Sequence, residues 1–340
     1  MADVKAVIEK EQDQIRFDFV GKMKRFFTAS GVIIALFVVA LLVKGLNYGI
    51  DFEGGSIFHY RFEKALTTEQ VRSVLEGNSA LKGELGAIVV QRVLAEVDLN
   101  IVPGEKTPEV ETAVKGSEFI IHTGASAEVA QAEDIEPRLE AAFVAAGLGR
   151  FEKLQRQFIG PTVGRRLQTK ALWALIISIV GILLYISIRF EFVQAVAAVV
   201  ALLHDSLFVL GLFCLLSKEI NIGIMAAVLT IIGYSLNDTI VILDRIRENN
   251  RLKGRLPYDF RVNLSINQSL SRTINTSVTT LLAVLALLVL GGVVIRDFAL
   301  AMTVGVFVGT YSSVFIVAPI VVKWYYRDHP NAPKAYEEAH

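Results

Sequence analysis

The chain has 340 residues, a length that would suit two soluble domains. Its composition excludes that arrangement: 53% of the residues are hydrophobic even with glycine left out, whereas soluble domains reach roughly 45–50% with glycine counted. Lys and Arg (34) balance Asp and Glu (34), so net charge does not indicate a nucleic-acid partner, and the single Cys214 excludes an internal disulfide or a cysteine metal site. These numbers indicate an integral membrane protein with one soluble insert.

Six stretches are long and apolar enough to cross a bilayer as helices, which takes roughly 20 residues. Four of them contain no charged residue, whereas the third holds His204 and Asp205 and the fourth holds Asp238. The first is too long for a cleavable signal sequence and lacks a small-residue cleavage site. In chain order the predicted spans are Phe26–Val43, Ala171–Ile188, Phe192–Ser217, Ile220–Leu243, Thr273–Ile295 and Phe298–Val322.

The short segments that flank these spans predict the orientation. Those on one side hold seventeen Lys and Arg residues, and those on the other hold only Lys218 and Arg296. Because cytoplasmic loops carry the excess of Lys and Arg, both termini are expected in the cytoplasm. This predicts a cytoplasmic segment 1–25, helix 1 at 26–43, an external domain at 44–170, helices 2–6 within 171–322, and a cytoplasmic tail 323–340.

The long external segment has the pattern of a small α+β domain. Phe58, Tyr60 and Phe62 alternate with polar neighbours, as in a half-buried strand. The order of predicted elements is βαββαβ, which is typical of a ferredoxin-like sandwich. The predicted elements are strand 56–62, helix 67–76, strand 86–94, strand 117–123, helix 126–146 and strand 151–159, with a loop insertion at 95–116. His59 and His122 have no partner motif, so we expect surface or packing roles for them.

The sequence contains none of the common short enzyme signatures, such as the phosphate-binding loop, the H-E-x-x-H helix or the G-x-S-x-G elbow. We therefore expect a transport component rather than an enzyme, with no cofactor and no metal. Any energy it uses would come from a partner or from an ion gradient.

Asp238 is the main candidate for a functional residue, because an ionisable group inside a span costs at least ~2.5–3.5 kcal/mol and normally has a partner. The fifth span opens with Arg272, followed at helical spacing by Thr276 and Thr279. The connection between spans four and five should place Arg272 and Asp238 at comparable depth. A carboxylate balanced between a nearby cation and desolvation can bind and release a proton. The alternative is a purely structural role.

The third span offers a second candidate, the pair His204 and Asp205. Asp205 lies on a face of small residues with Ala198 and Ala201, so the pair could relay protons or simply bond a neighbouring helix, and the sequence favours neither. In the sixth span, Gly305 and Gly309 form a G-x-x-x-G face that predicts close helix packing.

Five motifs stand in a fixed order along the chain, and together they identify a resemblance. They are Gly49-Ile-Asp-Phe-Glu-Gly-Gly55, Ile159-Gly-Pro-Thr-Val-Gly164, His204-Asp205, Gly233-Tyr-Ser-Leu-Asn-Asp-Thr239 running into Asp244-Arg-Ile-Arg-Glu-Asn249, and Arg272-Thr-Ile-Asn-Thr-Ser277. With these motifs the chain resembles, over about residues 17–325, the SecF family, the smaller membrane subunits of the bacterial SecD–SecF protein-export complex in the RND superfamily.

The resemblance implies six of the twelve spans of a complete transporter, with SecD supplying the other half. It also implies the SecYEG channel, YajC and unfolded preprotein as partners, and a place in the bacterial inner membrane with the α+β domain in the periplasm. The complex is expected to use the proton motive force in late steps of translocation. In that family the acid and the cation that match Asp238 and Arg272 are linked with proton conduction. The resemblance thus predicts a proton relay of Asp238 and Arg272 together with Asn237 and Thr239, which flank the acid in its motif.

Two glycine-containing motifs flank the external domain and are candidate hinges, although simple turns would account for them equally well. Their residues are Gly49, Asp51, Gly54 and Gly55 before the domain, and Gly160, Pro161 and Gly164 after it. Two other functions remain open: half of an RND-type exporter of small molecules or lipids, and a non-conducting scaffold for the Sec channel.

Overall fold

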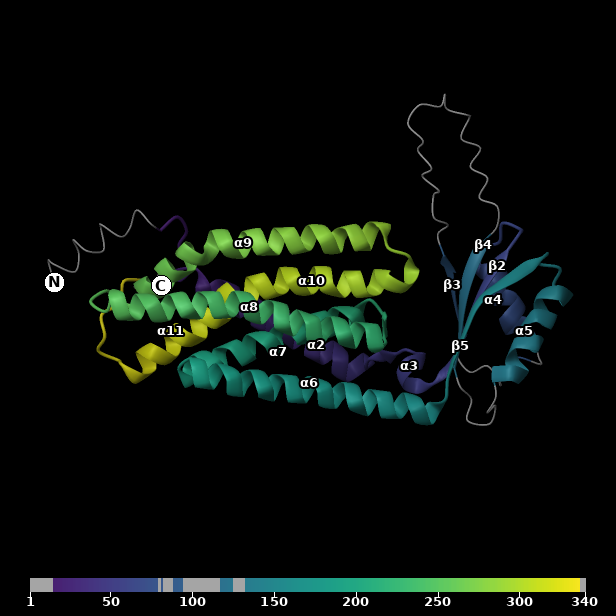
Figure 1. Ribbon diagram of the computed structural model, residues 1–340, viewed down its shortest axis with the longest axis horizontal. Helices are drawn as coiled ribbons and strands as arrows, with labels where there is room; N and C mark the ends of the chain where they lie inside the picture. The colour runs from purple at the N-terminus through teal and green to yellow at the C-terminus, as the bar shows by residue number, and fades with distance from the viewer. Residues whose placement is uncertain (1–14, 79–80, 82–87, 94–116, 125–131, 337–340) are drawn as a thin grey trace, which may run out of the picture. The chain divides into compact units, whose positions relative to one another are not determined.

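The computed structural model describes residues 15–78, 81, 88–93, 117–124 and 132–336. These belong to two compact units, one made of Met1–Asn47 with Trp173–His340 and the other of Tyr48–Leu172. Figure 1 shows the first as a bundle of long helices and the second as a sheet with two helices. Each unit has its own hydrophobic core.

Six helices of the described chain are long and apolar enough to cross a membrane, which confirms the predicted number of spans. They are α2 (Met23–Lys44), α6 (Pro161–Arg189), α7 (Phe192–Leu215), α8 (Ile222–Leu252), α9 (Tyr258–Leu290) and α10 (Val293–Phe315), the last continued by α11 (Val317–Asp328). Two short strands, β1 (Asn47–Tyr48) and β6 (Glu219–Ile220), complete the elements near the spans.

Several helices differ from the predicted bounds, and the differences have physical causes. α6, α8 and α9 extend about two to four turns into polar sequence, because backbone hydrogen bonds continue where hydropathy ends. Gly291 and Gly292 end α9 before the predicted limit. The predicted sixth span is interrupted at Ile316, since Pro319 cannot donate to Phe315 and its ring would clash with that carbonyl.

α7, α8 and α10 form the centre of the membrane-spanning unit. The apolar part of the span formed by α10 and α11 is 67% buried, that of α7 is 56% buried and that of α8 is 50% buried, against 6% for α6. α10 lies directly against α8, because Gly305 and Gly309 leave no side chain between them: a Cβ on Gly305 would lie 2.3 Å from Ile231, and one on Gly309 would lie 2.9 Å from Ser235. Small residues thus allow the close approach of these two helices.

The second unit contains β2 (Gly55–Phe62), α4 (Thr68–Gly77), β3 (Ile88–Val93), β4 (Ser117–Gly124), α5 (Ala132–Ala145) and β5 (Phe151–Ile159). The strands pair antiparallel in the order β3-β4-β2-β5, which confirms the predicted ferredoxin-like arrangement. α4 and α5 cover one face of the sheet (Figure 1). The predicted insertion 95–116 lies outside the described residues.

Local sequence accounts for the elements of this domain. Phe58, Tyr60 and Phe62 are fully buried beneath the helices, as their alternation predicts. Thr67 caps α4 through a reciprocal pair of hydrogen bonds with Gln70. The domain therefore has a well-specified strand register, because a shift by one residue would expose this aromatic row.

Glu136 of α5 ties that helix to β5 by ion pairs with Lys153 and, at 2.8 Å, Arg156. The hydrogen bond from Lys153 is the main reason that the pKa of Glu136 lies below its ordinary value. A lowered pKa stabilises the fold above the unfolded-state value of about 4.3, and this contribution disappears as the pH falls through the folded-state pKa.

We expect Glu136→Gln to lower the free energy of unfolding of the domain at neutral pH. Between neutral and acid pH, the variant should then lose less stability than wild type does. The measured quantity is the urea concentration at which the amides of β5 lose protection from hydrogen exchange. Samples are equilibrated at pH values from 3 to 7 and then labelled with a short exchange pulse at one fixed pH. Glu152→Gln is the matched control, since Glu152 lies on β5, the strand to which Glu136 is paired, but its side chain is 71% exposed. Equal acid sensitivity of wild type and Glu136→Gln would contradict the assignment.

Candidate functional site

Asp238 is buried on α8, with 2% of its surface exposed. Its two carboxylate oxygens accept hydrogen bonds from hydroxyls of α9: Thr276 Oγ1 at 3.4 Å and Ser277 Oγ at 3.4 Å. Ser277 Oγ also lies 2.7 Å from Thr310 Oγ1 of α10. The acid is therefore held by neutral hydroxyls where three helices meet.

Arg272 lies one turn before Thr276 on α9, and its backbone carbonyl accepts a hydrogen bond from the Thr276 hydroxyl. Its side chain is exposed, and within the described residues it forms no ion pair with Asp238 at 4.0 Å or less. The structure thus places Arg272 one turn along α9 from a residue that contacts Asp238, without an ion pair between the two. Any attraction between them acts across the intervening hydroxyls.

The neighbours of Asp238 in its motif point to different sides of α8. Asn237 is exposed, together with Thr230 and Gly233. Thr239 is 1% exposed, and its hydroxyl has no hydrogen-bond partner among the residues that the structure describes. The same holds for the hydroxyls of Tyr234, one turn before Asp238, and of Thr273, one turn before Ser277. Three buried hydroxyls on α8 and α9 thus have no hydrogen-bond partner in the described part of the chain.

His204 and Asp205 form a second buried polar group, which joins four helices. His204 Nε2 lies 2.5 Å from Ser30 Oγ of α2, and its Nδ1 lies 2.9 Å from Asp205 Oδ1. The other carboxylate oxygen of Asp205 accepts hydrogen bonds from Ser235 of α8 (2.6 Å) and Ser312 of α10 (2.8 Å). Each side-chain polar atom of the pair thus has a partner.

The two acidic groups are connected through the same two helices. Ser235 precedes Asp238 by three residues on α8, and Ser312 follows Thr310 by two residues on α10. A shift of α8 or α10 near Asp238 would therefore change the hydrogen bonds of Asp205, and through His204 those of α2.

Sequence reasoning missed the serines that make these contacts. It selected Thr276 and Thr279 on α9, but Thr279 is exposed and donates to its own helix, whereas Ser277 contacts the acid. Ser30, Ser235 and Ser312 were also missed. The only feature of the sequence that could have indicated these serines is a hydroxyl within an apolar run. Many membrane helices carry such a hydroxyl without a partner on another helix.

The two glycine-containing motifs contact each other within the second unit. Gly54 (φ +83°) lies so close to Pro161 that a Cβ on it would stand 2.8 Å from the proline Cα. A Cβ on Gly164 would stand 2.6 Å from the carbonyl oxygen of Phe52, in the short helix α3 (Ile50–Glu53). The residues predicted as hinges thus include three in tight backbone contact.

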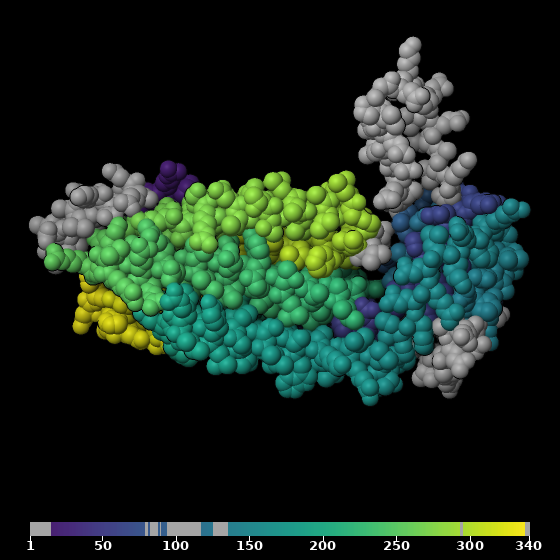
Figure 2. Space-filling view, in the orientation of Figure 1, coloured from purple at the N-terminus to yellow at the C-terminus, as the bar shows by residue number. Residues whose placement is uncertain are grey.

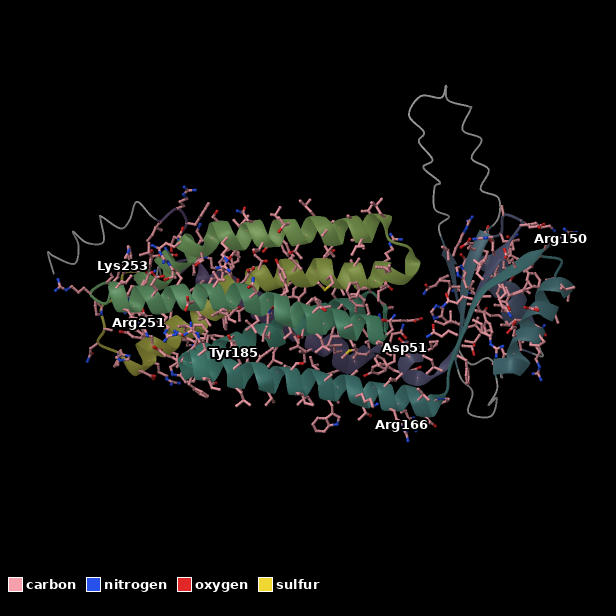
Figure 3. All side chains as sticks on the ribbon, viewed as in Figure 1. Asp51, Arg150, Arg166, Tyr185, Arg251 and Lys253 are labelled. Atoms are coloured by element: carbon pink, nitrogen blue, oxygen red, sulfur yellow. The ribbon has the colours of Figure 1, made fainter. Side chains whose placement is uncertain are left out.

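The other members of these motifs differ in how closely they are packed. Gly49 is the N-cap residue of α3 in an extended conformation, Asp51 lies in that helix (Figure 3), and Gly160 has open space where a Cβ would stand. Gly55 (φ +146°) begins β2, and a Cβ there would stand 2.3 Å from the carbonyl oxygen of Thr123.

Six spans with an inserted ferredoxin-like domain and a buried acid in the fourth span define a polytopic membrane protein of the transport type. Two family models match the chain: "Protein export membrane protein SecD/SecF, C-terminal" over residues 139–327 and "SecD/SecF GG Motif" over residues 39–65. The second match includes Gly54 and Gly55. The chain belongs to the SecD/SecF family of protein-export membrane proteins.

Individual relatives agree with this assignment. The protein translocase subunit SecF of Calditerrivibrio nitroreducens is 37% identical over 92% of this chain and 96% of its own length. The translocase subunit SecDF of Thermus thermophilus is 40% identical over 91% of this chain, which spans only 38% of that longer protein. A crystal structure of SecDF from Thermus thermophilus, described as a translocon-associated membrane protein, is similar to this chain with a TM-score of 0.74 and 38% sequence identity. The match covers 91% of this chain and 39% of the SecDF chain.

Proposed function

We propose that the chain is the SecF-type subunit of an accessory complex that uses the proton motive force to promote late steps of preprotein translocation across the bacterial inner membrane. The observation that supports it most is Asp238: a carboxylate buried in a span and bonded to two hydroxyls, with no cation of the described residues within 4.0 Å. Such a group can gain or lose a proton without breaking an ion pair. Spans carry buried acids at a free-energy cost, and they are usually functional there.

The mechanism that we propose starts at this carboxylate. Protonation removes a charge from the bundle and changes the hydrogen bonds to Thr276 and Ser277, so α8, α9 and α10 favour another packing. The serine bonds of Asp205 pass this shift through His204 to α2, the helix that leads into the external domain. The external domain then grips or releases unfolded preprotein.

The energy available sets a limit on this switch. One elementary charge that crosses the membrane yields about 2.3 kcal/mol per 100 mV, enough for a bias of more than tenfold. A change from 1:99 to 99:1 takes about 5.5 kcal/mol, so a pH difference or a second proton has to contribute.

A partner half is supported by polar residues on the outside of the bundle. Thr230, Gly233 and Asn237 form an exposed stripe on α8 at helical spacing, and α9 exposes Arg272, Asn275 and Thr279 in the same spacing. Polar side chains that face lipid are unfavourable, so another protein should cover them. We propose that SecD does so, with SecYEG, YajC and unfolded preprotein as further partners, and with both termini in the cytoplasm.

Gly233→Leu should reduce co-purification with SecD severalfold, because leucine would project into the interface. Gly181→Leu in α6 is the matched control: both glycines are exposed within a span and have open space at the Cβ position. The measurement is the amount of SecD recovered with the tagged chain from membranes. Equal recovery with both variants would place the partner elsewhere.

The proposed function is tested by preprotein translocation into membrane vesicles that contain the chain, SecD, SecYEG and the SecA ATPase. Completion of translocation should be faster with a proton gradient than after an ionophore has dissipated it, and this difference should disappear without the chain. A gradient effect of the same size without the chain would contradict the proposal.

A further inference from the structure

The first three turns of α6 carry an unusual group of cations. Arg165, Arg166 and Lys170 lie within six residues, and with Thr162 and Thr169 they occupy one face of the helix, at spacings of three and four residues. All five side chains are exposed and line an open hollow of the surface. In Figure 3 Arg166 points away from the helix.

None of the three cations forms an ion pair with any residue in the described part of the chain. The Thr162 hydroxyl adds a hydrogen-bond donor on the same face, whereas the Thr169 hydroxyl donates to the backbone carbonyl of Arg165 at 3.0 Å. The positive end of the helix dipole lies beside Thr162. The face therefore presents three cations and one hydroxyl donor with no carboxylate among them, which is complementary to an anion and above all to phosphate.

Helix geometry places this face at the level of the lipid headgroups. The apolar part of α6 begins at Ala171, and residues rise 1.5 Å each, so Lys170 stands at the edge of the hydrocarbon and Arg165 about 8 Å beyond it. The headgroup layer is roughly 5–8 Å thick on each side. Trp173, 57% exposed, follows on the same helix where interfacial tryptophans are common.

Little of the protein covers this helix. Only 6% of its apolar part is buried, and Ile177 and Leu184 are 64% and 60% exposed. Figure 2 shows the teal side chains of α6 along the surface. A helix exposed in this way contacts lipid chains along its apolar part. A lipid is therefore the ligand whose chains would lie on that apolar part while its headgroup reaches the cationic face.

We propose that Arg165, Arg166 and Lys170 bind the phosphate of an anionic phospholipid in the leaflet next to the α+β domain, with the Thr162 hydroxyl as an additional donor. This inference does not depend on proton coupling. The bound lipid would anchor the start of α6, where the span joins the external domain, at the membrane surface.

The test is native mass spectrometry of the purified full chain in micelles that contain equal amounts of phosphatidylglycerol and phosphatidylcholine. Wild type should retain phosphatidylglycerol preferentially. The triple variant Arg165→Gln, Arg166→Gln, Lys170→Gln should lose this preference by tenfold or more, since it removes all three cations that attract the phosphate. Arg165→Lys with Arg166→Lys should retain it.

The matched control removes three cations from the α+β domain: Lys64→Gln, Arg72→Gln and Arg150→Gln. Its lipid preference should equal that of wild type. An unchanged preference in the α6 variant, or an equal loss in the control, would overturn the proposal. So would loss of a co-purifying protein instead of lipid from the α6 variant, because it would assign this face to a protein partner.

Discussion

Asp238→Asn should abolish the gradient-dependent part of preprotein translocation and leave the ATP-driven part intact. The amide has the size of the carboxyl group and can still accept from Ser277 or Thr276, but it cannot take up or release a proton. We expect the variant, with or without a gradient, to translocate at the rate of wild type treated with ionophore. The measurement is the rate at which translocation is completed in vesicles at a fixed ATP concentration.

Asp244→Asn provides the control for this experiment. Asp244 is on the same helix, less than two turns from Asp238, but it is exposed. Its substitution makes the same chemical change away from the hydroxyls of Thr276 and Ser277. The stimulation of translocation by the proton gradient should therefore be unchanged. If Asp238→Asn kept full stimulation, the proton role would be wrong, and a non-conducting scaffold would be the better account of the chain.

Gly55→Ala should destabilise the α+β domain by about 2–5 kcal/mol, from backbone strain and overpacking together. Gly55 has φ +146°, and a Cβ would stand 2.3 Å from the carbonyl oxygen of Thr123, a backbone atom on the adjacent strand β4. The start of β2 would have to move away from its partner. Hydrogen exchange of the full chain should show a large loss of protection in β2 and β4.

Gly147→Ala separates the two causes. Gly147 also has positive φ, +63°, but a Cβ there would meet nothing within 4 Å. It should cost only the conformational strain of about 1–2 kcal/mol. Equal losses of protection in the two variants would show that the contact with Thr123 contributes nothing, and that backbone conformation alone requires the second glycine of the pair.

The sequence alone was enough to predict the six spans and the βαββαβ domain, because both depend on local properties. Span number follows from the length of apolar runs, and the aromatic row Phe58, Tyr60 and Phe62 specifies the buried face of β2 by alternation. Asp238 could be selected in the same way, since an acid in an apolar run is conspicuous in any context.

Only the tertiary structure decided which side chains meet. The rotation of each helix about its axis depends on neighbours that are distant in sequence, and it turned Ser277 rather than Thr279 toward Asp238 and left Arg272 outside contact distance. Ser30 and His204, which are hydrogen-bonded, lie 174 residues apart in the sequence. Neither the pattern around Ser30 nor that around His204 predicts this contact. Local periodicity determined the elements of this protein, and the packing of helices against one another determined its polar sites.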